Sequence, residues 1–129
     1  MKKIKKSKNL YNKAIKIIPG GNMLLSKRPE LFLPGGWPTY FSKTKGCEVW
    51  DLDNNKYYDL SLMGVGTNIL GYNNKRVDSE VLKAIKNGNM STLNCKEEVL
   101  LAEKLIEINP WAQMVKLART GGEANAIAV

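Results

Sequence analysis

The residues best suited to chemistry lie near the carboxyl end of the sequence, in the run Thr120-Gly121-Gly122-Glu123-Ala124-Asn125. We predict a short, mostly apolar strand before this run, at residues 114–118, and an alanine-rich helix after it, at residues 123–129. The first N–H groups of a helix have no acceptor within the helix and carry partial positive charge. Two glycines let an anion approach such amides closely, and the Thr120 hydroxyl can donate a further hydrogen bond. The pattern therefore predicts a site for a phosphate or another anion.

The same strand, turn and helix also fit a tight connection that binds no ligand. No Gly-Lys-Ser/Thr follows the glycines and no third glycine completes a dinucleotide fingerprint, so neither nucleotide-binding motif is present. The sequence contains no histidine, which excludes a His-based catalytic triad and a His-ligated metal within these residues. No acidic run has the spacing of a calcium loop, and we predict no metal site.

The charge of the chain is concentrated at its amino end. Five of the residues that make up the net charge of +8 are lysines 2, 3, 5, 6 and 8. Such a tail fits a solvated approach to a helix, and it also fits an anionic partner such as nucleic acid. The two cysteines have no metal-type spacing, which favours reduced thiols and a cytoplasmic location. No run approaches the roughly 18 apolar residues of a membrane span.

The amino-terminal half is predicted to contain one helix and a pair of strands. The helix covers residues 7–18, with Ser7 as its N-cap and a Pro-Gly-Gly stop at 19–21. An irregular connector follows at residues 22–38. Tyr40-Phe41-Ser42 can begin the strand pair, which continues at residues 47–52, turns at Asp53-Asn54-Asn55 and returns at residues 56–60. Residues 63–72 are expected to form a glycine-rich loop with close backbone approaches.

Two amphipathic helices are predicted between this loop and the anion-binding run. One covers residues 75–87, and Gly88 suits the position just after its end. The other covers residues 96–108, is capped by Asn94 or a neighbour, and ends at Asn109-Pro110. Together with the strand at 114–118, these helices predict an α/β domain that is only begun within these residues.

Several segments, taken in order, resemble the start of the class III aminotransferases, and in particular the branch that is similar to glutamate-1-semialdehyde 2,1-aminomutase. The resemblance covers nearly the whole chain after the lysine tail. The segments that carry it are Ile18-Pro19-Gly20-Gly21, residues 45–59, Asn68-Ile69-Leu70-Gly71-Tyr72, Glu97-Glu98 with residues 101–105, and residues 114–124, which match the family's Ser-Gly-Thr-Glu-Ala loop.

This resemblance implies the N-terminal portion of a fold type I transferase that depends on pyridoxal 5'-phosphate (PLP). Residues 1–72 would supply the N-terminal helix, the connector and a small antiparallel β-hairpin region of the small domain. Residues 73–129 would begin the large PLP-binding domain. By position, Thr120, Gly121 and Gly122 would contact the PLP phosphate, and Glu123 would have a structural role at the start of the helix. The family also implies a homodimer that acts on a small-molecule amino donor and a carbonyl acceptor.

The sequence departs from the family in ways that bear on function. Gly122 replaces a common threonine, so phosphate binding would depend more on backbone amides. Lys27 or Arg28 would have to replace the arginine that serves the aminomutase's substrate carboxylate, and the aminomutase tryptophan is replaced near Val65. These changes leave the substrate open between glutamate semialdehyde and another amino donor or carbonyl acceptor.

No lysine here matches the family's Schiff-base lysine, which lies further along in complete members. We therefore expect no catalytic residue within 1–129 and no transamination by this chain alone. Two alternatives stay open: a non-catalytic interaction module, and a nucleic-acid binder that uses the basic tail, although the remaining sequence gives little support for nucleic acid.

Overall fold

The first helix, α1, covers Lys5–Ile17 in the computed structural model, which describes residues 3–61, 63–88 and 90–129. Its N-cap residue is Ile4, and the prediction of Ser7 as the N-cap is wrong, because Ser7 lies inside the first turn and is fully buried. The acceptors come instead from the Asp53 carboxylate, 2.9 Å from the Lys6 amide and 3.4 Å from the Ser7 amide. A side chain from a turn 46 residues further along the chain thus supplies the acceptors expected from a local serine.

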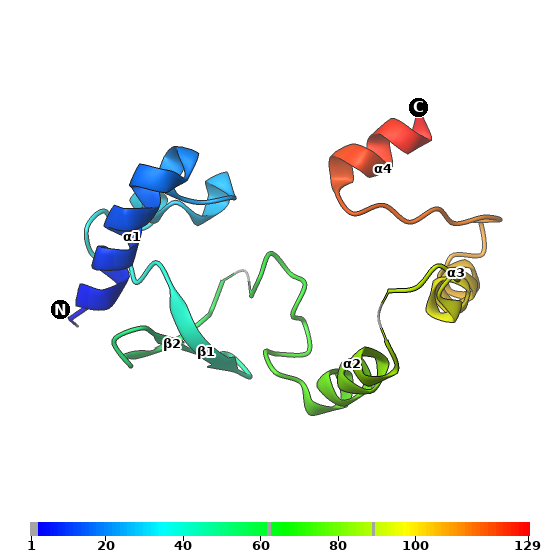
Figure 1. Cartoon of the computed structure of the whole chain (residues 1–129), viewed down its shortest axis with the longest axis horizontal. Coiled ribbons are helices and arrows are strands. Elements are labelled where there is room, and N and C mark those ends of the chain that lie inside the picture. Colours follow the sequence, from blue (N-terminus) through cyan, green and yellow to red (C-terminus); the bar gives the residue numbers. More distant parts are fainter. Residues whose placement is uncertain (1–2, 62, 89) are drawn as a thin grey trace. The chain divides into compact units, whose positions relative to one another are not determined.

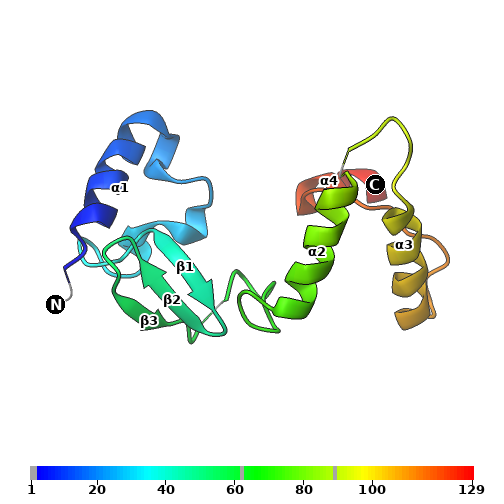
Figure 2. The same ribbon diagram turned by 60° about the horizontal axis from the view of Figure 1, so that its bottom comes forward.

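An antiparallel sheet of three strands follows α1 and the connector (Figure 2). Its strands are β1, Phe41–Lys45, β2, Glu48–Asp51, and β3, Lys56–Tyr58. The predicted strand pair at 47–52 and 56–60 corresponds to β2 and β3, while β1 extends well beyond the expected Tyr40-Phe41-Ser42. Between α1 and β1, the connector forms three short 3₁₀ turns, Pro19–Gly21, Leu25–Lys27 and Pro29–Leu31.

The turn between β2 and β3 is organised by the carboxylate of Asp51, which is 1% exposed. One oxygen accepts hydrogen bonds from the amides of Asp53 at 2.9 Å and Asn55 at 2.8 Å. The other accepts from the Asn55 side-chain amide at 2.8 Å and the Tyr57 hydroxyl at 3.0 Å. Burial raises the pKa of Asp51, but these donors outweigh burial and hold it below the ordinary value. Burial and the bond to Asp51 raise the pKa of Tyr57 to about 12.

The loop after β3 returns to the sheet at Gly46. The amides and carbonyls of Gly46 and Tyr72 exchange hydrogen bonds at 2.9 and 2.8 Å, and the Tyr72 hydroxyl donates to Asp59 at 2.7 Å. A Cβ at Gly71 would lie 3.3 Å from the Cα of Gly46, at a φ of +88°. The expected close backbone approach is therefore confirmed at Gly71, where a larger residue would push the two segments apart.

Two helices follow with the predicted bounds: α2, Lys75–Asn87, and α3, Lys96–Ile108. Gly88 has a φ of +94° and donates its amide to Ile85, as expected for the residue after a helix. The N-cap of α3 is Cys95, the neighbour of Asn94, and its thiol donates to Glu97 at 2.8 Å.

The prediction of a strand at residues 114–118 is wrong for this structure, which has no strand there. A strand needs a hydrogen-bonded neighbour, and within the described residues no other segment pairs with this one. The last helix, α4, covers Gly121–Ala128 and so begins two residues earlier than expected.

The chain separates into two units, Met1–Lys83 and Ala84–Val129. The first contains α1 and the sheet, and the second contains α3 and α4 (Figure 1). Among the described residues, the buried hydrophobic side chains are those of Ile4 and Ala14. Helices α2, α3 and α4 contain no buried residue. None of the helices in the described part of the chain is long and apolar enough to cross a membrane.

Replacing Asp53 with alanine should loosen α1, because the amides of Lys6 and Ser7 lose their acceptor. Loss of a helix cap costs about 1 kcal/mol, which corresponds to roughly fivefold faster amide exchange through local opening. Amide hydrogen exchange of the 129-residue chain, read over α1, measures this. Glu103→Ala removes the same charge from exposed α3 and should leave α1 unchanged. Equal exchange in the two variants would refute the capping role.

Stability of the sheet should fall at both extremes of pH. The folded pKa of Asp51 lies below its unfolded value, so its contribution is complete above about pH 4 and is lost as pH falls through the folded pKa. The folded pKa of Tyr57 is raised to about 12, so its contribution is complete below about pH 10 and disappears as pH rises through about 12. Urea unfolding of the chain, followed by circular dichroism at a series of pH values, reports both changes in the free energy of unfolding. Asp51→Asn should reduce the loss of stability at acid pH, and Tyr57→Phe should reduce the loss at alkaline pH.

Candidate functional site

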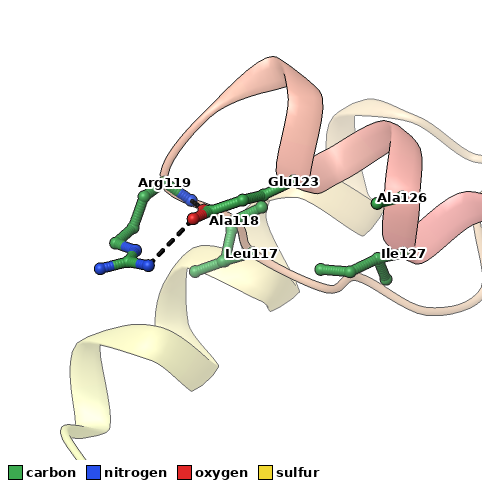
Figure 3. Close-up of a pocket in the computed structure, with 6 residues that line it drawn as sticks. All are labelled: Leu117, Ala118, Arg119, Glu123, Ala126 and Ile127. Atoms are coloured by element: carbon green, nitrogen blue, oxygen red, sulfur yellow. Dashed lines mark hydrogen bonds and ion pairs between the residues drawn. The ribbon is translucent and has the colours of Figure 1, made fainter.

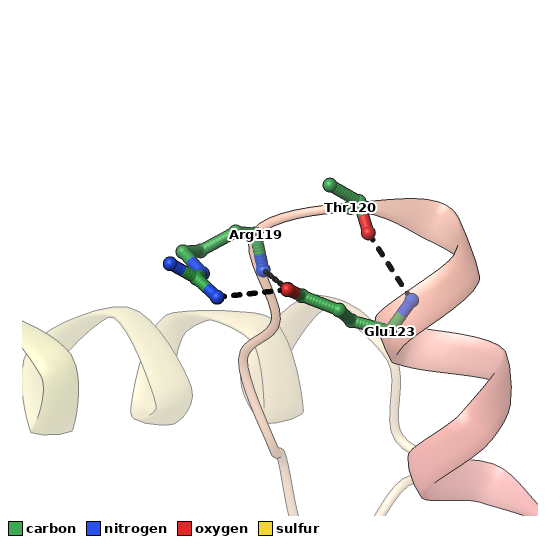
Figure 4. Close-up of polar contacts among 3 residues, drawn as sticks. All are labelled: Arg119, Thr120 and Glu123. Atoms are coloured by element: carbon green, nitrogen blue, oxygen red, sulfur yellow. Dashed lines mark hydrogen bonds and ion pairs between the residues drawn. The ribbon is translucent and has the colours of Figure 1, made fainter.

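The carboxyl-terminal unit presents the predicted anion-binding run as the start of α4. Thr120 is the N-cap, with extended backbone angles, and its hydroxyl oxygen accepts the amide of Glu123 at 3.1 Å (Figure 4). Its carbonyl accepts the amide of Ala124 at 3.0 Å. Because the hydroxyl acts as an acceptor within the chain, its proton remains available to a group outside the helix.

Gly121 and Gly122 form the first turn of α4, and no contact among the described residues requires glycine at either position. Neither has the positive φ that favours glycine. A Cβ at Gly121 would meet no atom within 4 Å, and one at Gly122 would meet the Thr120 hydroxyl oxygen at 3.9 Å. Glycine costs a helix about 1 kcal/mol relative to alanine, so two in succession weaken α4 without relieving any contact. The space that a Cβ would fill is open.

The amides beside that space are free to bind an acceptor. Within the residues that the structure describes, the amides of Gly121 and Gly122 make no hydrogen bond. They stand at the positive end of the helix dipole, next to the hydroxyl of Thr120. Three donors and an unfilled space fit the terminal oxygens of a phosphate group. The three residues predicted from sequence therefore offer three hydrogen-bond donors side by side at the start of α4.

Glu123 stabilises the turn that precedes α4. Its carboxylate accepts the backbone amide of Arg119 and one guanidinium nitrogen of Arg119, both at 2.9 Å (Figure 4). The Glu123 amide donates to the Thr120 hydroxyl, and the Glu123 carboxylate accepts the amide of Arg119, the residue before the N-cap. This is a variant of the capping box, in which the carboxylate accepts the amide of the N-cap residue itself. These contacts occupy the carboxylate and agree with the expected structural role of Glu123.

An open hollow borders the same helix (Figure 3). Leu117 and Ile127 are its large apolar members, and each is about half exposed. Such a lining suits contact with other apolar side chains better than it suits a polar ligand. The six lining residues are Leu117, Ala118, Arg119, Glu123, Ala126 and Ile127.

The other residues singled out from sequence lie in the amino-terminal unit. The guanidinium of Arg28 covers Gly20, where an added Cβ would lie 2.6 Å from one of its nitrogens. Lys27 is exposed at the end of a 3₁₀ turn. Val65 is exposed and adopts an unusual φ of +63°. No group of three or more potential metal ligands occurs in the described parts of the chain.

Comparison with known proteins gives a consistent result. The family profile described as "Aminotransferase class-III" matches residues 35–129. A 3-aminobutyryl-CoA aminotransferase of Cloacimonas acidaminovorans is 36% identical over 98% of this chain and 30% of its own length. A glutamate-1-semialdehyde 2,1-aminomutase of Fusobacterium nucleatum is 38% identical over 97% of this chain and 28% of its own length. The chain thus spans less than a third of these curated relatives.

A solved structure shares the fold of this part. The FumI protein of Sphingopyxis sp. MTA144, in its PLP internal aldimine form, superposes with a TM-score of 0.84 and 26% sequence identity. The match covers 96% of this chain and 29% of that one. The predicted α/β fold, an incomplete portion of a fold type I transferase, is confirmed by this match.

Proposed function

Since this chain belongs to the class III aminotransferase family, we propose that it forms the amino-terminal part of a PLP-dependent aminotransferase or aminomutase. The reaction would transfer an amino group to a carbonyl compound. The observation that carries the proposal is the conjunction of the family match over residues 35–129 with the free amides of Gly121 and Gly122. Either observation alone is weaker, because a family profile does not locate a site and a helix start does not identify a ligand.

The residues that would hold the cofactor are Thr120, Gly121 and Gly122. The Thr120 hydroxyl would donate to one phosphate oxygen, while the two glycine amides would donate to others. Glu123 would keep the turn in shape through Arg119. Because Gly122 carries no hydroxyl, two of the three contacts would come from the backbone. The binding geometry would then depend chiefly on how α4 begins.

PLP, when bound, supplies an electron sink that permits proton and amino-group transfer at the carbon bearing the nitrogen. The residues of this chain would orient the cofactor by its phosphate and would not move protons. We propose that the lysine that holds the cofactor lies outside residues 1–129 and that this chain alone is not catalytic.

The wider organisation follows from the same proposal. Residues 1–72 would contribute to the small domain, and residues 73–129 would open the large PLP-binding domain. The complete protein would be a cytoplasmic homodimer that acts on a small-molecule amino donor and a carbonyl acceptor. The substrate would be glutamate semialdehyde or another amino donor or carbonyl acceptor, because Lys27 or Arg28 would have to serve in place of the aminomutase arginine, and the aminomutase tryptophan is replaced near Val65.

Replacing Gly121 with alanine tests the proposed phosphate contact. The new Cβ meets no atom of the chain, and alanine should strengthen α4 by about 1 kcal/mol. It should nevertheless weaken PLP binding about tenfold or more, because the Cβ would occupy the space in which the phosphate approaches the amide. A charge-assisted hydrogen bond lost in this way costs roughly 1.5–3 kcal/mol. The measurement is an NMR titration of the Thr120 and Gly122 amides with PLP, and with pyridoxal, which lacks the phosphate.

Asn125→Ala is the matched control, because it also raises helix propensity in α4 but adds no atom at the helix start. Its PLP affinity should equal that of the unaltered chain. A Gly121→Ala variant that binds PLP as tightly as the control, or amide shifts that are equal with PLP and pyridoxal, would contradict phosphate binding at this loop.

The proposed position of the cofactor-holding lysine, outside residues 1–129, predicts that the isolated chain forms no single, stable PLP adduct. After incubation with PLP and reduction by borohydride, mass spectrometry should find at most scattered, substoichiometric labelling of its surface lysines. Stoichiometric labelling of one lysine would overturn the prediction.

A further inference from the structure

The exposed side of α1 consists only of lysines and asparagines. At about 100° per residue, these side chains lie within an arc of about 160° around the helix axis. The opposite side holds Ser7 and Ala14, which are buried, and Tyr11 and Ile15, which border Gly21. The exposed side chains, which together form the lysine face of α1, are those of Lys5, Lys6, Lys8, Asn9, Asn12, Lys13 and Lys16.

The charge of the lysine face is not neutralised within the described part of the chain. Helix α1 contains no acidic residue, and none of its lysines forms an ion pair with a described residue. The Asp53 carboxylate accepts the backbone amides of Lys6 and Ser7 and pairs with no lysine side chain. Residues 1–83 contain 15 basic and 7 acidic side chains, whereas residues 84–129 contain five of each. The whole net charge of +8 therefore lies in the unit that contains α1.

The positions of these lysines oppose the formation of the helix. Cations are unfavourable near the positive end of a helix dipole, yet Lys5, Lys6 and Lys8 are all close to the start of α1. Lys5 and Lys8 are three residues apart, as are Lys13 and Lys16, so each pair places like charges side by side. A feature that breaks a local rule without relief inside the protein is expected at a functional surface. An anion from outside the chain would supply that relief.

The pattern of the lysine face indicates which anion fits it. Asn9 and Asn12 lie in its middle. Lys8 lies on one side of them, and Lys6 and Lys13 lie on the other. Cations on both sides of a neutral polar centre match two rows of phosphates with base edges between them, because an asparagine amide can both donate to a base and accept from it. The lysine face has no apolar side chain, so it lacks the group by which an interfacial helix enters lipid.

We propose that the lysine face of α1 binds duplex DNA, with the helix in the major groove. That groove is about 12 Å wide and admits an α-helix. The lysines contact phosphates of the two strands, and Asn9 and Asn12 face the base edges. Helix α1 precedes residues 35–129, which match the family profile, so this binding goes beyond the proposed function and requires no PLP.

The test is fluorescence anisotropy of a labelled DNA duplex of about 20 base pairs, titrated with the 129-residue chain at several salt concentrations. Each phosphate that a lysine neutralises contributes about −0.9 to the slope of log affinity against log salt. Five such contacts predict a slope of about −4.5, or roughly a hundredfold loss of affinity between about 50 and 150 mM salt. A slope shallower than about −2, or no binding at about 50 mM salt, would overturn the proposal.

A double variant locates the contact on α1. Lys13→Gln with Lys16→Gln should reduce the salt slope by about two and weaken binding at least fivefold at low salt. It also removes a repulsion, so circular dichroism should show unchanged or greater helix content. The matched control is Lys45→Gln with Lys75→Gln, which removes the same charge from exposed residues of the same unit and should change affinity less than twofold. Equal affinities of the two double variants would show that the lysine face is not the binding surface.

The asparagines and two other polyanions test the placement in the groove. Asn9→Ala with Asn12→Ala should weaken DNA binding at least threefold without changing the salt slope, because no charge is removed. An RNA duplex of the same length should bind at least threefold more weakly, because its major groove is too narrow for the helix. Equal binding of the RNA duplex, or equally tight binding of vesicles that contain phosphatidylserine, would overturn the proposal in favour of a general polyanion surface. None of these variants alters Thr120, Gly121 or Gly122, so the PLP titration tests the proposed function separately.

Discussion

The buried carboxylate of Asp51 determines the conformation of much of the amino-terminal unit. Four donors converge on it, and together they fix the turn that joins β2 and β3. The same turn places the Asp53 carboxylate where it accepts the first amides of α1. It also places the Asn55 side-chain amide where it donates to the carbonyl of Lys3. With so little apolar burial in this unit, polar contacts of this kind hold the helix to the sheet. Such contacts specify geometry closely, because a misplaced buried carboxylate would be costly.

Features that depend on neighbouring residues were predictable from sequence. The bounds of α2 and α3 follow from a period of about 3.6 in apolar residues, and Gly88 follows from the backbone angles needed after a helix. The start of α4 was predicted within two residues, because an alanine-rich run follows the glycine turn. The fold class was also predicted, through the order of segments along the chain.

Features that depend on distant residues were not predictable. Serine is a residue type that often caps helices, so Ser7 was the expected N-cap. Asp53, 46 residues away, supplies the acceptor instead, and α1 begins at Lys5, two residues before the predicted start. Residues 114–118 had the composition of a strand, but strand formation also requires a partner that the described residues do not provide. For the candidate site, the sequence predicts Thr120, Gly121 and Gly122. The structure adds that the two glycine amides are free within the described residues and that an added Cβ would meet open space.

The pairing of Arg119 with Glu123 also governs the electrostatics of this loop. One positive and one negative side chain lie 2.9 Å apart, so the turn carries no net charge. At this loop an incoming anion would interact with the dipoles of the helix start, whose influence fades within about one turn. Dipoles of this kind retain a ligand at contact distance but do little to steer it through solvent. The loop would accordingly discriminate by fit at close range, with an ionic-strength dependence much weaker than that of a cationic site.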